Sequence, residues 1–228
     1  MPERIQFTTS DDVDIVGHWV STPTTIGGAI LLHSMPATKE SWGAFQMILA
    51  KRGIASLAID LRGHGESIHA NGRAPLDARA FSDEEHLSSM EDVRGAYEWI
   101  RRRGIDREQI VVIGASIGAN LALRFLTEYP TLPGAVLLSP GLNYHGVRTD
   151  DIVRYVAPHQ SVWMTASAGD DDESANAANT LMDQLEVDVK VYHRLKLAGH
   201  AMKMIDGDAA LMGEIANWCR DTIQNFDI

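Results

Sequence analysis

The sequence predicts an α/β fold in which a mostly parallel sheet of about eight strands has helices on both faces. Two observations lead to this prediction. Short runs rich in β-branched residues and leucine alternate along the 228-residue chain with segments whose apolar residues recur at helical spacing. No internal repeat, low-complexity tract or Pro/Gly/Ser-rich linker divides the chain. We therefore expect a single domain over residues 1–228, with right-handed crossovers between the parallel strands.

The elements can be assigned in order along the chain. Two extended runs, at 4–9 and 13–20, predict an antiparallel start, because Ser10, Asp11 and Asp12 form a turn between them. Further strands are predicted at 28–33, 54–59, 110–115, 135–139, 162–167 and 187–195. Intervening helices are indicated by Trp42, Phe45 and Leu49; by Val93, Ala96, Tyr97 and Ile100; by residues 117–129; by residues 175–185; and by Met212, Ile215, Ala216 and Cys219. In such sheets functional groups lie beyond the carboxyl ends of the strands.

Composition excludes several classes of protein. The net charge is −11, which argues against unaided binding to nucleic acid or to an anionic membrane surface. No segment approaches the roughly 18 apolar residues that a membrane-spanning helix needs. The first residues carry acids where a secretory signal would be apolar, and the single cysteine, Cys219, cannot form an internal disulfide. We expect a cytoplasmic protein without a membrane span.

A candidate nucleophile follows the strand at 110–115. The segment Gly114-Ala115-Ser116-Ile117-Gly118 has the pattern G-x-S-x-G between a predicted strand and a predicted helix. The bare pattern is weak evidence, but this context strengthens it, since both glycines allow the strand and helix to approach closely. The N–H groups that begin the helix would also favour an oxyanion at Ser116. The alternative is an ordinary helix start capped by Ser116.

A serine nucleophile of this kind needs a carboxylate and then a histidine later in the chain. His200 is the histidine downstream of Ser116 that follows a predicted strand and precedes a predicted helix. The strand at 162–167 is followed by a run of acids, of which Asp170 comes first and is favoured, with Asp171 second. The remaining acids suit the start of the next helix. The run lacks the ligand spacing of a calcium loop, so no metal site is expected.

Several motifs together resemble the α/β-hydrolase fold superfamily over essentially the whole chain, and within it compact serine esterases of the dienelactone-hydrolase kind. They are LLHSM at 31–35, Trp42, DLRGHGES at 60–67, GASIG at 114–118, the acidic loop at 170 and AGH at 198–200. The resemblance implies a catalytic triad of Ser116, Asp170 and His200. It also implies that backbone N–H groups of Met35 and Ile117 hold the oxyanion and that His33 braces the loop. Ser34 departs from the family pattern, which usually has glycine there.

Many relatives carry a helical cap domain where this chain has only residues 140–160, too few for a domain. We therefore expect an open site that hydrolyses small or medium acyl esters without a cofactor. The loop at 68–81, with Met35, Leu142 and Met202, is expected to line the pocket. Thioester or amide hydrolysis, acyl transfer to other acceptors and a non-catalytic ligand-binding role remain alternatives, because the fold does not choose among them.

Overall fold

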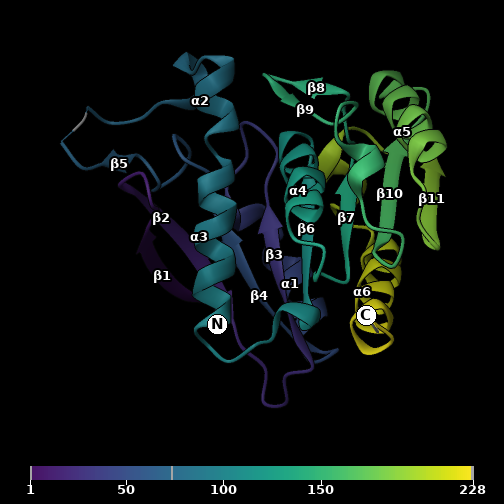
Figure 1. Ribbon diagram of the computed structural model, residues 1–228, viewed down its shortest axis with the longest axis horizontal. Coiled ribbons are helices and arrows are strands. Elements are labelled where there is room, and N and C mark those ends of the chain that lie inside the picture. Colours follow the sequence, from purple (N-terminus) through teal and green to yellow (C-terminus); the bar gives the residue numbers. More distant parts are fainter. Residues whose placement is uncertain (1, 73, 227–228) are drawn as a thin grey trace.

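The computed structural model describes residues 2–72 and 74–226. Its central sheet is formed by β1 (Glu3–Thr8), β2 (Val13–Val20), β3 (Gly27–Leu32), β4 (Ile54–Ile59), β5 (His69–Ala70), β6 (Ile110–Ala115), β7 (Gly134–Leu138), β10 (Ser161–Ser167) and β11 (Val189–Leu195). The strand order is β1-β2-β4-β3-β6-β7-β10-β11, with β5 beside β2 (Figure 1). Strand β2 is antiparallel to β1, β4 and β5, and the other pairings are parallel. The predicted fold class is confirmed, including its antiparallel start.

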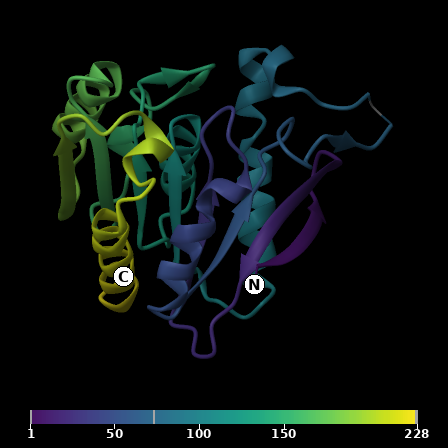
Figure 2. The ribbon, with the colours of Figure 1, turned by 180° about the vertical axis from the view of Figure 1, so that it is seen from behind.

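Helices cover both faces of this sheet. They are α1 (Gly43–Ala50), α2 (Asp83–Leu87), α3 (Met90–Arg101), α4 (Ile117–Glu128), α5 (Asp172–Gln184) and α6 (Ala209–Gln224). Helices α3, α4 and α5 lie on the face seen in Figure 1, and α1 and α6 on the face seen in Figure 2. Each face buries its own apolar cluster, so β3, β4, β6 and β7 are buried along their whole length. No helix in the described part of the chain is long and apolar enough to cross a membrane.

Three small elements lie outside the sequence prediction: β5, α2 and the hairpin of β8 (Asn143–Tyr144) and β9 (Val147–Arg148). The hairpin is tied to α4 by the buried side chain of Asn120. Its amide Nδ2 donates to the Val147 carbonyl at 2.7 Å, and its Oδ1 accepts from the Gly141 N–H at 3.0 Å. Because Asn120 lies in the first turns of α4, these two bonds hold the hairpin at the end of the sheet where α4 begins (Figure 1).

Candidate active site

Ser116 occupies the sharp turn between β6 and α4. Its backbone has φ 55° and ψ −121°, a strained conformation for a residue other than glycine. A Cβ on Gly114 would lie 2.0 Å from the carbonyl oxygen of Gly118, and a Cβ on Gly118 would lie 2.4 Å from that of Leu32. Neither position can therefore carry a side chain. The two glycines let the strand and the helix close around the turn, which leaves the Ser116 side chain at the carboxyl edge of the sheet.

The Ser116 hydroxyl is paired with His200, and His200 with Asp171. Oγ of Ser116 lies 2.9 Å from Nε2 of His200, and Nδ1 of His200 lies 2.9 Å from Oδ2 of Asp171. An ionised carboxylate only accepts, so Nδ1 carries the hydrogen and Nε2 offers its lone pair to the serine hydroxyl. Ser116 makes no side-chain hydrogen bond that caps α4, which argues against the alternative of an ordinary helix cap.

Asp170, the acid that the sequence favoured, is not the residue hydrogen-bonded to His200. Its carboxylate accepts from the Ser167 hydroxyl and from the Gly199 N–H. The bond from Ser167 is the main cause that lowers the pKa of Asp170. Gly169 has a φ of +108°, and the turn it makes after β10 directs the second acid, Asp171, to the imidazole. Asp170 instead ties the loop that carries His200 to the end of β10.

The sequence did not lead us to three hydroxyl groups that lie around Asp171. Ser139 donates to its Oδ2 at 2.8 Å and Ser174 to its Oδ1 at 3.0 Å, while Tyr144 lies 2.9 Å from the Ser174 hydroxyl. Ser139 carried a usable signal, because it is the last residue of the strand predicted at 135–139 and so lies at the carboxyl edge. Ser174 was hidden in a run of acids, and Tyr144 lies in a polar connection without a periodic pattern.

Two backbone N–H groups near Ser116 have no acceptor in the described part of the chain: that of Met35, in the loop after β3, and that of Ile117, at the start of α4. His33 holds this loop in place. Its Nδ1 lies 2.9 Å from the Ser34 carbonyl, and its Nε2 accepts from the Leu61 N–H at 3.0 Å. Free N–H groups of this kind can receive a developing negative charge on a substrate oxygen.

The far end of the same loop is fixed by a buried ion pair. The backbone N–H and the Nζ of Lys39 both donate to the carboxylate of Asp60, each at 2.8 Å. The Lys39 and Asp60 side chains are buried, and Asp60 also accepts from the Glu66 N–H at 2.9 Å. The turn that follows β4 therefore holds the loop at His33 and at Lys39. This contact gives the DLRGHGES motif a structural role.

Buried His33 should make the folded protein less stable in mild acid. Burial is the main cause that lowers its pKa from 6.5 to about 4, and the nearby His64 acts in the same direction. Between these values the unfolded chain binds more protons than the folded one, so stability falls as pH falls through this range. Through this effect His33 should lower the free energy of unfolding by on the order of 2 kcal/mol when the pH falls from 7.5 to 4.5.

Urea unfolding of the wild type and of His33→Gln at both pH values measures this contribution. The variant should lose less stability on acidification than the wild type does. The raised pKa of buried Asp92, about 6, acts in the opposite direction but is common to both proteins and cancels in the comparison. An equal loss in the two proteins would contradict the assignment.

The expected pocket residues lie on two sides of the sheet. Met35 and Leu142 pack against the cluster under α3, α4 and α5, whereas buried Met202 belongs to the cluster under α1 and α6. A common wall formed by the three remains a prediction. Among the described residues, no group of three or more His, Cys, Asp or Glu side chains is arranged to hold a metal ion.

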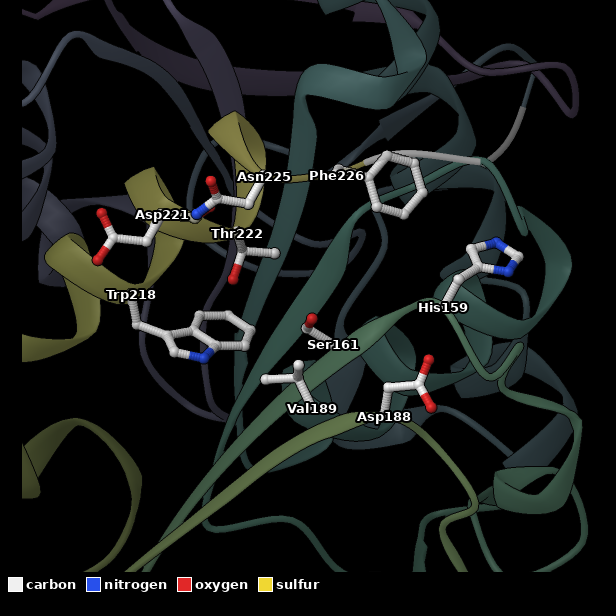
Figure 3. Close-up of a pocket in the computed structure, with 9 residues that line it drawn as sticks. All are labelled: His159, Ser161, Asp188, Val189, Trp218, Asp221, Thr222, Asn225 and Phe226. Carbon is white, nitrogen blue, oxygen red and sulfur yellow. The ribbon is translucent and has the colours of Figure 1, made fainter.

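A surface cavity of about 370 Å³ lies elsewhere, where β10 and β11 begin and α6 ends. Figure 3 shows Trp218 to the left of Ser161 and Val189, and Phe226 above Asp188. Ser161 and Val189 are the first residues of their strands, and His200 follows the last residues of β11. This cavity is therefore at the opposite edge of the sheet from Ser116.

The chain is similar to known proteins in sequence and in structure. Residues 27–217 match the family model described as serine aminopeptidase, S33. A putative 2-succinyl-6-hydroxy-2,4-cyclohexadiene-1-carboxylate synthase of Bacillus subtilis (strain 168) is 27% identical over 135 residues, 58% of this chain and 44% of that protein. The match thus spans less than half the length of this relative.

Two solved structures share the fold over nearly the whole chain. The esterase Pf2001 of Pyrococcus furiosus superposes with a TM-score of 0.75 at 16% identity, covering 99% of this chain and 93% of that one. The α/β hydrolase GrgF of Penicillium sp. sh18 superposes with a TM-score of 0.78 at 15% identity, covering 99% of each chain. At such identities the likeness is one of fold.

Proposed function

Because this chain belongs to the serine aminopeptidase S33 family of α/β hydrolases, we propose that it is a serine hydrolase that cleaves small or medium carboxylic esters through an acyl-enzyme intermediate. The observation that carries the proposal is the line of hydrogen bonds from Ser116 through His200 to Asp171, 2.9 Å at both contacts. A serine hydroxyl is a poor nucleophile until an adjacent base takes its proton. His200 is oriented to do so, and Asp171 favours the imidazolium that results.

The proposed cycle has two halves. In the first, Oγ of Ser116 attacks the ester carbonyl carbon, its proton passes to Nε2 of His200, and the N–H groups of Met35 and Ile117 hold the oxyanion. The carbon–oxygen bond to the alcohol then breaks, and the alcohol leaves with the proton from His200. In the second half, a water molecule gives a proton to His200 and attacks the acyl group, and Ser116 regains its proton as the carboxylic acid leaves.

The proposed substrate size rests on the segment between β7 and β10. It contains the β8–β9 hairpin and a short helical turn at Val153–Tyr155, which supports a single domain without a sizeable cap. A site of this kind is reached from solvent and suits small or medium acyl groups, with Met35, Leu142 and Met202 as proposed lining residues. The His200 side chain is 40% exposed, in agreement with such access.

Labelling with a fluorophosphonate tests the proposal directly. The probe should attach once per chain, at Ser116, and abolish hydrolysis of p-nitrophenyl butyrate, because it reacts with activated serines. A series of p-nitrophenyl esters should then show higher kcat/KM for acetyl to hexanoyl than for palmitoyl groups. A folded protein that takes up no label would contradict the hydrolase proposal and favour a non-catalytic ligand-binding role.

The family match favours amide hydrolysis as a second candidate function. The same residues could protonate an amine as the leaving group, so labelling does not separate the two. The two functions are separated by the rates at which the protein hydrolyses alanine p-nitroanilide and the matching alanine p-nitrophenyl ester, each divided by the uncatalysed rate of the same compound. A larger rate enhancement for the anilide would identify a peptidase, and a larger one for the ester supports the first proposal.

A further inference from the structure

We propose that the hydroxyl groups of Ser139, Ser174 and Tyr144 form a positioning network that keeps Asp171 an ionised acceptor and sets the pH range in which His200 can accept the Ser116 proton. This inference rests on the proposed hydrolase function, but it concerns residues that form no bond to substrate. The three residues come from the end of β7, from α5 and from the β8–β9 hairpin. They therefore join three separate segments around one carboxylate.

The direction of each hydrogen bond in the network follows from counting hydrogens. The Asp171 carboxylate can only accept, so the Ser174 hydroxyl donates its one hydrogen to Oδ1, at 3.0 Å. The 2.9 Å contact between Ser174 and Tyr144 must then have Tyr144 as the donor. Ser139 donates to Oδ2 at 2.8 Å and accepts from the Ala201 N–H at 2.9 Å. The two serine hydrogens thus point toward Asp171, and the Tyr144 hydrogen points toward Ser174, with the Ser139 carbonyl oxygen as a second, longer acceptor at 3.3 Å.

Burial makes this network strong. Ser139 and Ser174 are fully buried, and the Asp171 side chain is 10% exposed. Hydrogen bonds to a charged group count for more where water is excluded. Burial also raises the pKa of the Tyr144 phenol, opposed by its hydrogen bond with the Ser174 hydroxyl, so the phenol keeps its proton and remains a donor at neutral pH. Its ring meets that of His200 edge to face, with centroids 6.2 Å apart.

Other charged groups near His200 cannot replace the hydroxyls. Asp170, in the loop after β10, is exposed and already bonded to Ser167 and Gly199. Glu173 on α5 and Lys203 in the turn after His200 are also exposed, so water screens their charges. Among the described residues, the titratable side chains placed against the His200 ring are Asp171, by its hydrogen bond, and Tyr144, by its edge-to-face contact.

Loss of a donor should have a defined effect on the pH profile. A carboxylate that accepts several hydrogen bonds has its negative charge stabilised by them. Without Ser139 or Ser174, more of that charge acts on the imidazolium of His200, which then persists to higher pH. The acid limb of the kcat/KM profile should therefore move to higher pH, by about half to one pH unit for each hydroxyl removed.

The test measures the pH profile of p-nitrophenyl butyrate hydrolysis for Ser139→Ala, Ser174→Ala and Tyr144→Phe. We expect upward shifts for the two serine variants, a smaller one for Tyr144→Phe because it acts through Ser174, and several-fold lower kcat at neutral pH with little change in KM. Ser174→Thr, which restores a hydroxyl, should return the limb toward the wild-type position. Ser167→Ala is the matched control, since it removes a buried serine donor from Asp170 instead of Asp171.

A second readout separates this inference from the hydrolase proposal. The low-field proton resonance of His200 Nδ1–H reports its titration by NMR without any turnover, so Ser139→Ala and Ser174→Ala should shift that titration upward too. A wild-type protein that takes no fluorophosphonate label would defeat the hydrolase proposal and still allow this measurement. The positioning network is overturned if both serine variants titrate as the wild type does, or if Ser167→Ala shifts the limb equally.

Discussion

Replacement of Ser116 by alanine should lower ester turnover by about 10⁶-fold, the scale seen when a serine hydrolase loses its nucleophile. Among the residues that the structure describes, no other hydroxyl contacts Nε2 of His200, the nitrogen that takes the proton, because Ser174 lies at Nδ1. A residual rate of roughly 10³-fold over the uncatalysed reaction is expected from the oxyanion N–H groups and substrate binding. Hydrolysis of p-nitrophenyl butyrate measures the loss of turnover and the residual rate, and fluorophosphonate labelling measures the loss of the reactive serine.

The fold should survive this substitution. The Ser116 side chain does not cap α4, and alanine accepts the same backbone conformation at similar cost, so far-ultraviolet circular dichroism should be unchanged. Ser10→Ala is a suitable control, because that exposed hydroxyl bonds Glu91 at 2.6 Å in the turn between β1 and β2. It should keep full activity. A Ser116→Ala protein with more than about 1% of wild-type kcat/KM would exclude Ser116 as the nucleophile.

The sequence was sufficient to predict the framework of the site. Parallel strands bring their carboxyl ends to one edge of the sheet, so residues that directly follow different strands become neighbours whatever their separation in the chain. That rule brings Ser116 and His200 together across 84 positions. The glycines at 114 and 118 were also informative, because a strand-to-helix turn this tight leaves no room for a Cβ at either position.

The details of the loops could not be predicted in this way. Strand ends place Asp170 and Asp171 equally well, and the choice depends on the positive φ of Gly169 and on hydrogen bonds from Ser167 and Gly199 to the first acid. The β8–β9 hairpin has strands of two residues, too short for any periodic pattern. Its position comes from the tertiary contact with Asn120, which a single sequence does not reveal.

Substitution of Asp171 by asparagine should reduce kcat by about 10⁴-fold, because a neutral amide reverses the hydrogen bond to His200. The asparagine NH₂ donates where the carboxylate accepted, so Nδ1 loses its hydrogen and Nε2 gains one. The N–H at Nε2 then points at Ser116 and cannot take its proton. The wild-type side chain also receives bonds from Ser139 and Ser174, and the amide must satisfy these hydroxyls as well.

Asp170→Asn separates the two neighbouring acids. The amide oxygen of asparagine still accepts from Ser167 or from the Gly199 N–H, so the loop that carries His200 keeps part of its support and the loss of kcat should stay within about tenfold. Steady-state hydrolysis of p-nitrophenyl butyrate by both variants decides the assignment. If Asp170→Asn is the more damaged protein, the carboxylate that serves His200 in catalysis is Asp170. The contact with Asp171 would then belong to a resting arrangement that substrate binding rearranges.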